Sequence, residues 1–183
     1  QQSERFSGFP SDDEGVTTYR IFDTVVKRWD PTRPTTVALY PARAGGYARK
    51  DGKIGIRNRV LVIYTVKCAE HVAREIVFQS HNADVEMIGF DGCTDNQFAV
   101  NQIISLIRHP NVGAVLAVGL GCEYMQPEWY ADIAEKEGKL AGWLFIQQKG
   151  GTIPSIEYGV EWITAALKEL EKTPRTEMGF QDL

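Results

Sequence analysis

The pattern of apolar and polar residues changes near Gly45-Gly46. Beyond Arg59, short apolar runs alternate with segments in which apolar residues recur every three or four positions. This alternation is typical of strands that are followed by amphipathic helices. The runs predict strands at residues 60–66, 85–90, 112–118 and 140–146, and the periodic segments predict helices at 69–80, 94–108, 128–137 and 154–171.

Four strands alternating with four helices predict an α/β fold: a small parallel four-stranded sheet with helices on both faces. We assign this α/β domain to residues 45–175. Residues 1–44 are weakly patterned, with β-like runs at 16–22 and 35–40, and are expected to form an extended arm or linker. Residues 176–183 are expected to be a tail that leads to a further domain.

Composition narrows the class of protein. The 183 residues are 43% hydrophobic and 24% charged, which is enough apolar content for a packed core. A net charge of −4 and a pI near 5.4 argue against a nucleic-acid-binding protein. No apolar run approaches the ~20 residues that span a bilayer. Three cysteines, an odd number, argue against a disulfide scaffold, and we expect a cytoplasmic protein.

Each cysteine follows its own predicted strand: Cys68, Cys93 and Cys122 come after the first, second and third. Ligands of open parallel sheets bind beyond the carboxyl ends of the strands, and helix N-termini favour thiolates there. Three thiolates suit a soft metal or an iron–sulfur cluster with one open position. Their wide spacing matches no compact zinc ribbon. The alternative is that each cysteine is only a small buried apolar residue.

Glycine-rich turns follow the third and fourth strands, at Gly119-Leu120-Gly121 and at Gly150-Gly151-Thr152. They could present amide groups to a carboxylate or phosphate, with Thr152 as a helix N-cap, or they could be ordinary turns. Tyr124 stands where a dinucleotide-binding fingerprint requires glycine. Glu123 could be a base, a metal neighbour or a carboxylate in the first turn of a helix. Arg57 and Asn58 precede the first strand, at the opposite end of the sheet unless their loop folds over.

Several segments occur in the order of a known family. Residues 46–58 read Gly-Tyr-Ala-Arg-Lys-Asp-Gly-Lys-Ile-Gly-Ile-Arg-Asn, and residues 65–68 read Thr-Val-Lys-Cys. Three further segments follow: Arg-His-Pro-Asn-Val at 108–112, Gly-Leu-Gly-Cys-Glu at 119–123, and Gln-Gln-Lys-Gly-Gly-Thr at 147–152, which precedes a predicted helix. Together they resemble the altronate/galactarate dehydratase family, which also includes the large subunit of sulfolactate sulfo-lyase. Thr94 and Lys67 stand where the family usually has Gly and Asn.

The resemblance implies one domain of a larger hydro-lyase that uses iron to dehydrate a sugar acid, and we expect a homodimer. The residues that we assign are Glu123 and Lys67 for catalysis, Arg57, Asn58, Gly150, Gly151 and Thr152 for the substrate, and Cys68, Cys93 and Cys122 for iron. Two alternatives stay open: a non-catalytic dimerisation or docking module of such a lyase, and part of a sulfo-lyase that acts on sulfolactate. A flavodoxin-like nucleotide binder is disfavoured because the sequence has no phosphate-binding loop.

Overall fold

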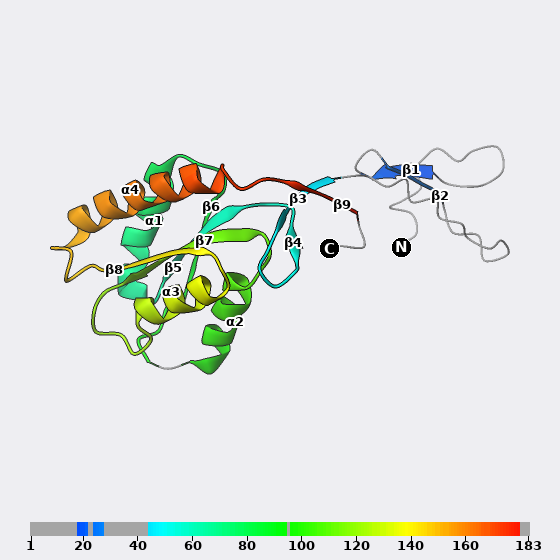
Figure 1. The fold of residues 1–183 in the computed structure, drawn as a ribbon. Coiled ribbons are helices and arrows are strands. Elements are labelled where there is room, and N and C mark those ends of the chain that lie inside the picture. Colours follow the sequence, from blue (N-terminus) through cyan, green and yellow to red (C-terminus); the bar gives the residue numbers. More distant parts are fainter. Residues whose placement is uncertain (1–17, 22–23, 28–43, 95, 180–183) are drawn as a thin grey trace. The chain divides into compact units, whose positions relative to one another are not determined.

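The computed structural model describes residues 18–21, 24–27, 44–94 and 96–179 (Figure 1). The chain forms two compact units, residues 1–43 and residues 44–183. In the first unit, β1 (Thr18–Ile21) and β2 (Thr24–Lys27) form an antiparallel hairpin. The β-like run predicted at residues 35–40 lies outside the described residues.

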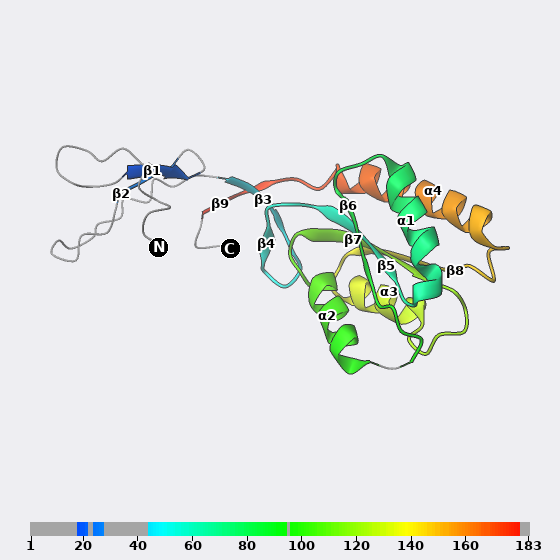
Figure 2. The same cartoon turned by 180° about the vertical axis from the view of Figure 1, so that it is seen from behind.

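The second unit is built on a parallel sheet with the strand order β6-β5-β7-β8. Helices α1 and α4 cover one face, and α2 and α3 cover the other (Figures 1 and 2). The predicted α/β fold, a parallel four-stranded sheet with helices on both faces, is therefore confirmed. The bounds are β5 (Arg59–Tyr64), α1 (Glu70–Ser80), β6 (Val85–Gly89), α2 (Gln97–Ile107), β7 (Val112–Gly119), α3 (Pro127–Lys136), β8 (Leu140–Phe145) and α4 (Thr152–Leu170).

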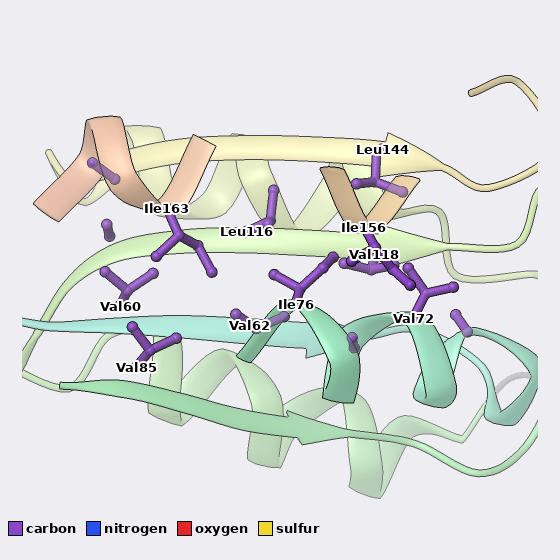
Figure 3. Close-up of a cluster of buried hydrophobic side chains, with 14 of the residues drawn as sticks. Val60, Val62, Val72, Ile76, Val85, Leu116, Val118, Leu144, Ile156 and Ile163 are labelled. Carbon is purple, nitrogen blue, oxygen red and sulfur yellow. The ribbon is translucent and has the colours of Figure 1, made fainter. Parts of the chain in front are cut away.

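The sheet is central because its middle strands are apolar on both faces. All eight residues of β7 are buried, and so are the four inner residues of β5. Alternate residues of these strands point to opposite faces. Val62 and Leu116 pack with Ile76 of α1 and Ile163 of α4 (Figure 3), and a second set packs with α2 and α3. The helices thus close a core on each side and leave the strand ends for the connecting loops.

A smaller antiparallel sheet lies in the same unit, with the order β4-β3-β9. Its strands are β3 (Ala44–Ala48), β4 (Ile54–Gly55) and β9 (Thr176–Met178). Residues 176–178, which the sequence assigned to a tail, therefore pair with Ala44–Gly46. Among the described residues, no helix is both long and apolar enough to cross a membrane.

Lys139 is a buried cation between α3 and β8. Its Nζ donates hydrogen bonds to the carbonyl oxygens of Ile107 and His109, at the end of α2. The Ile107 carbonyl lies in the last turn of α2, where no helical N–H follows to bond it, so the lysine caps the helix. Burial lowers the pKa of Lys139 to about 8, and the positive charge of Arg49 acts in the same direction.

Lys139 predicts a pH dependence of stability. Because its folded pKa lies near 8, below the ordinary 10.5, the unfolded chain binds more protons between these two values. The free energy of unfolding of the wild type should therefore rise from pH 8 to pH 10.5 relative to that of Lys139→Met. Denaturant unfolding at several pH values measures the difference. The exposed Lys136, changed to Met, is the control and should run parallel to the wild type. Parallel curves for Lys139→Met as well would contradict the prediction.

Candidate functional site at the carboxyl end of the sheet

The three cysteines lie in the loops that leave the carboxyl ends of β5, β6 and β7. Cys68 is in a 3-10 turn, η2 (Lys67–Ala69), directly before α1. Cys93 and Cys122 lie farther from their helices, because α2 starts at Gln97 and α3 at Pro127. All three thiols are free and exposed, so none is the small buried residue of the simpler interpretation. Only Cys68 has the close relation to a helix start that the sequence predicted for all three.

The cysteine loops contact one another, but they do not form an assembled metal site. The backbone N–H of Tyr124 donates to the carbonyl oxygen of Cys93 at 3.3 Å, which joins the loops of Cys93 and Cys122. Among the described residues, no three His, Cys, Asp or Glu side chains lie close enough together to hold a metal ion. The thiols have the chemistry of iron ligands.

Glu123 is buried and holds its own loop together. Its Oε1 accepts from the Thr65 hydroxyl at 2.7 Å and from the Leu120 N–H at 3.1 Å. Its Oε2 accepts from the N–H groups of Gly121 at 2.8 Å and of Cys122 at 3.0 Å. Both its oxygens are therefore occupied, and Glu123 is not in the first turn of a helix, because α3 starts only at Pro127. The same contacts fill the amide cradle that Gly119-Leu120-Gly121 could have offered a carboxylate or phosphate ligand.

The two glycines of this turn make that arrangement possible. A Cβ on Gly119 would lie 2.2 Å from Glu123 Oε1, and Gly121 has a φ of +128°. The carboxylate can fold back onto the amides because Gly119 has no side chain in its way and Gly121 readily adopts a positive φ. This loop stands at the point where the chain reverses its direction across the sheet, since β5 leads to α1 and β7 to α3 on the opposite face. Ligands of such sheets bind at this point.

Lys67 is an exposed cation beside Cys68. Its Nζ lies 2.7 Å from Glu70 Oε2 and 3.4 Å from Asp91 Oδ2. The hydrogen bond to Glu70, with the nearby charge of Asp91, raises the pKa of Lys67, and the same bond lowers the pKa of Glu70. Lys67 therefore stays a cation near neutral pH, paired with two carboxylates, and it is poorly suited to accept a proton.

Gly150 and Gly151 form the turn between β8 and α4. Both have positive φ values, +90° and +106°, which glycine adopts readily. Gly151 is the N-cap of α4, so Thr152 is the first helical residue and not the predicted cap. The turn adjoins the Glu123 loop, because the Gln147 N–H donates to the Leu120 carbonyl oxygen at 3.2 Å. Of the two glycine turns, this one is not filled by an acidic side chain of the described residues.

The structure does not bring Arg57 and Asn58 to the cysteines. They precede β5, at the amino end of the sheet, about 20 Å away at ~3.3 Å per residue. Asn58 Oδ1 accepts from the Arg49 guanidinium at 3.0 Å, and its Nδ2 donates to the Leu170 carbonyl oxygen at 3.2 Å. Arg49 also donates to the Pro110 carbonyl oxygen at 2.6 Å. The segment at 46–58 thus joins the small sheet to the ends of α2 and α4, and its loop does not fold over the main sheet.

Sequence reasoning missed the roles of three residues at the carboxyl end: Tyr64, Thr65 and Asp91. The Tyr64 hydroxyl donates to Asp91 Oδ1 at 3.1 Å, and the buried Thr65 hydroxyl reaches Glu123. Burial, helped by the negative Asp91, raises the pKa of Tyr64 and keeps its hydroxyl a donor. The signal in the sequence was two hydroxyl side chains at the end of an otherwise apolar run.

A sequence profile described as "D-galactarate dehydratase/Altronate hydrolase, second domain" matches residues 46–171. The chain belongs to this family. The expected resemblance is thereby confirmed. The segment that matches the family includes all three cysteines, Lys67 and Glu123.

Two curated proteins are similar in sequence to this chain. The altronate dehydratase of Escherichia coli (strain K12) is 29% identical over 133 residues, which cover 63% of this chain and 26% of the relative. The altronate dehydratase of Bacillus subtilis (strain 168) is 31% identical over 91 residues, 43% of this chain and 18% of the relative. The matched region is thus about a quarter or less of the length of either relative. No solved structure matches the chain.

Alanine substitutions at the neighbouring residues Arg57 and Asn58 should have different effects on the free energy of unfolding. Asn58→Ala should lower the free energy of unfolding by ~1–3 kcal/mol, because the Leu170 carbonyl and the Arg49 guanidinium each lose a partner. Arg57→Ala should change it by about 0.5 kcal/mol or less, because the exposed Arg57 contributes only backbone hydrogen bonds within the described residues. Denaturant unfolding monitored by circular dichroism tests both. Equal losses would show that Asn58 has no special structural role.

Proposed function

We propose that the chain is a domain of a hydro-lyase that removes water from a sugar acid of the altronate or galactarate type. The observation that carries the proposal is the family match over residues 46–171. Both relatives described above are named altronate dehydratase, which supports the same class of substrate. The enzyme would be a carbon–oxygen lyase, with this chain as one of its parts.

Such a reaction removes a proton from the carbon beside a carboxylate and expels a hydroxyl group from the next carbon. The substrate carboxylate must be held while negative charge develops. At the carboxyl end of the sheet, Lys67 is an exposed cation, and the turn at Gly150-Gly151 leads into the N-terminus of α4. Lys67 would bind the carboxylate and the start of α4 would bind a second oxygen of the substrate.

Glu123, which the sequence suggested as a base, is assigned a different part. Its oxygens already accept four hydrogen bonds, and its side chain is buried, with the residue 3% exposed. A proton on either oxygen would occupy a lone pair that now accepts a hydrogen bond, so one of these contacts would be lost. Glu123 would therefore shape the loop of Cys122, and the proton would pass to another group of the enzyme.

Iron is a further part of the proposal. When bound, iron would act as a Lewis acid toward the departing hydroxyl group. The support for it is the donor type: three exposed thiols in three loops at one end of the sheet. Because these thiols are not gathered, the loops would have to close around the metal, and ordering of the loops would accompany binding.

The iron proposal predicts the outcome of anaerobic reconstitution of the full-length enzyme. Iron should be retained after desalting, and Cys68→Ser should lose most of the iron and at least ~100-fold in dehydration rate. The unfolding midpoint should stay near that of the wild type, because Cys68 is exposed. Iron analysis, with altronate and galactarate as substrates, measures the outcome. Wild-type enzyme that turns over fully without iron would overturn this part of the proposal.

Lys67 allows a separate test of the carboxylate site. Lys67→Met should raise KM roughly 10–100-fold, the usual effect of losing a hydrogen bond to a charged group, and Lys67→Arg should recover most of it. Lys172→Met is the matched control, since Lys172 is an exposed lysine just after α4, paired with Glu169. An unchanged KM in Lys67→Met would remove Lys67 from the substrate site.

A second candidate function is a non-catalytic docking module, whose partner would be the rest of a longer lyase. One observation favours it. Tyr124, Trp129 and Phe98 are exposed at 68%, 41% and 75%, and the first two line a hollow of about 430 Å³ with Val100 and Met125. In this function Cys68→Ser would leave turnover nearly intact, whereas Trp129→Ala would weaken the association of the domain.

Sulfolactate as a third substrate, with sulfite as product, tests the sulfo-lyase alternative. The homodimer and the cytoplasmic location stay predictions.

A further inference from the structure

Two consecutive residues at the end of the central strand reach the two neighbouring cysteine loops. Tyr64 is the last residue of β5, and its side chain packs with the core under α1 and α4. Thr65 follows it, and alternation along the extended chain turns its side chain to the other face. Cys68 comes three residues later, in the loop of the same strand.

Tyr64 binds the loop of Cys93. Its ring lies over Gly89 of β6, where an added Cβ would come within 2.2 Å of the ring. From there the hydroxyl donates to Asp91 Oδ1 at 3.1 Å. Lys67 Nζ approaches the other oxygen of Asp91 at 3.4 Å. Asp91 is two residues before Cys93, so these contacts hold the start of its loop to β5.

Thr65 binds the loop of Cys122. Its hydroxyl donates to Glu123 Oε1 at 2.7 Å, and Glu123 accepts from the amides of Leu120, Gly121 and Cys122. Thr65 and Glu123 are both 3% exposed. A hydrogen bond to a buried carboxylate is stronger than one that competes with water, so this contact outweighs the exposed contact of Tyr64 with Asp91.

We infer that Tyr64 and Thr65 are positioning residues that hold the loops of Cys93 and Cys122 to the strand that carries Cys68. The inference rests on the proposed function in one respect, that the three thiols bind the same iron. The contacts of Tyr64 and Thr65 themselves do not depend on iron. Neither residue belongs to the proposed substrate site. Each acts through the acidic residue of one loop, Asp91 or Glu123, and the central position of β5 lets one strand serve both loops.

Amide-resolved hydrogen exchange on the full 183-residue chain tests the inference without iron or substrate. Thr65→Val removes only the hydroxyl and should speed exchange of the Leu120, Gly121 and Cys122 amides roughly tenfold. Thr65→Ser keeps the hydroxyl and should restore the slower exchange. Thr164→Val removes a hydroxyl from the exposed side of α4 and should leave these amides unchanged.

Tyr64→Phe should act on the other loop. It should speed exchange of the Tyr124 amide, which donates to the Cys93 carbonyl, by roughly threefold and leave the Gly121 amide near the wild-type rate. Unchanged exchange in both variants would overturn the inference. So would a uniform acceleration that includes the core amides of β7, because it would report general destabilisation and not the release of one loop.

Iron reconstitution of the full-length enzyme separates this inference from the proposed function. Thr65→Val should retain less iron than the wild type, and Thr65→Ser should retain as much. If Cys68→Ser keeps full iron and activity, the iron proposal fails while the exchange result still decides the role of Tyr64 and Thr65. If Thr65→Val loses iron but its loop amides exchange normally, the positioning role fails and the iron proposal stands.

Discussion

A carboxylate that is buried in a protein must be surrounded by hydrogen-bond donors, and this requirement organises the carboxyl end of the sheet. Glu123 meets it with three consecutive amides and one hydroxyl. The amides come from its own loop, which therefore has to curl around the side chain. The hydroxyl comes from the end of β5, which ties that loop to the centre of the sheet. The position of Cys122, the tightness of the glycine turn and the burial of Thr65 all follow from satisfying one negative charge.

The two ends of the sheet have different chemistry. At the amino end, Arg49, Asn58 and Asn111 bind backbone groups of neighbouring segments, and Asn111 Oδ1 accepts from the amides of Ile56 and Arg57. These side chains are committed to the fold. At the carboxyl end, three thiols and Lys67 are exposed. The segment that matches the family profile spans both ends, so it contains residues committed to the fold at one end and candidate chemical groups at the other.

Much of the fold could be predicted because the core strands are unusually uniform. The apolar run at residues 112–118 predicted β7, whose eight residues are all buried, and the apolar stripes of α1 and α4 are regular. The small sheet was not predicted, because Gly45-Gly46 and the two residues of β4 show no alternation. The start of α2 was placed too early, since the cap is Asn96, whose side chain accepts from the Ala99 amide.

The candidate site was predictable only in outline. Strand ends placed the cysteine loops correctly, because the direction of parallel strands decides which end they share. The function of Glu123 depends on a loop that folds back within three residues, and no spacing rule contains that information. Arg57 and Asn58 belong to a recurring motif, and a motif does not distinguish a residue that binds a ligand from one that binds its own backbone.

The strand order has a consequence for how the domain is made. β5 is the first strand of the main sheet in the sequence, yet it lies between β6 and β7. It gains its second neighbour only when residues 112–119 have been synthesised, and the Thr65–Glu123 bond spans 58 positions. Until then one edge of a strand whose four inner residues are apolar has no partner within the sheet. During synthesis on the ribosome, the carboxyl end of the sheet therefore assembles late, because β5 can pair with β7 only after β7 has been synthesised.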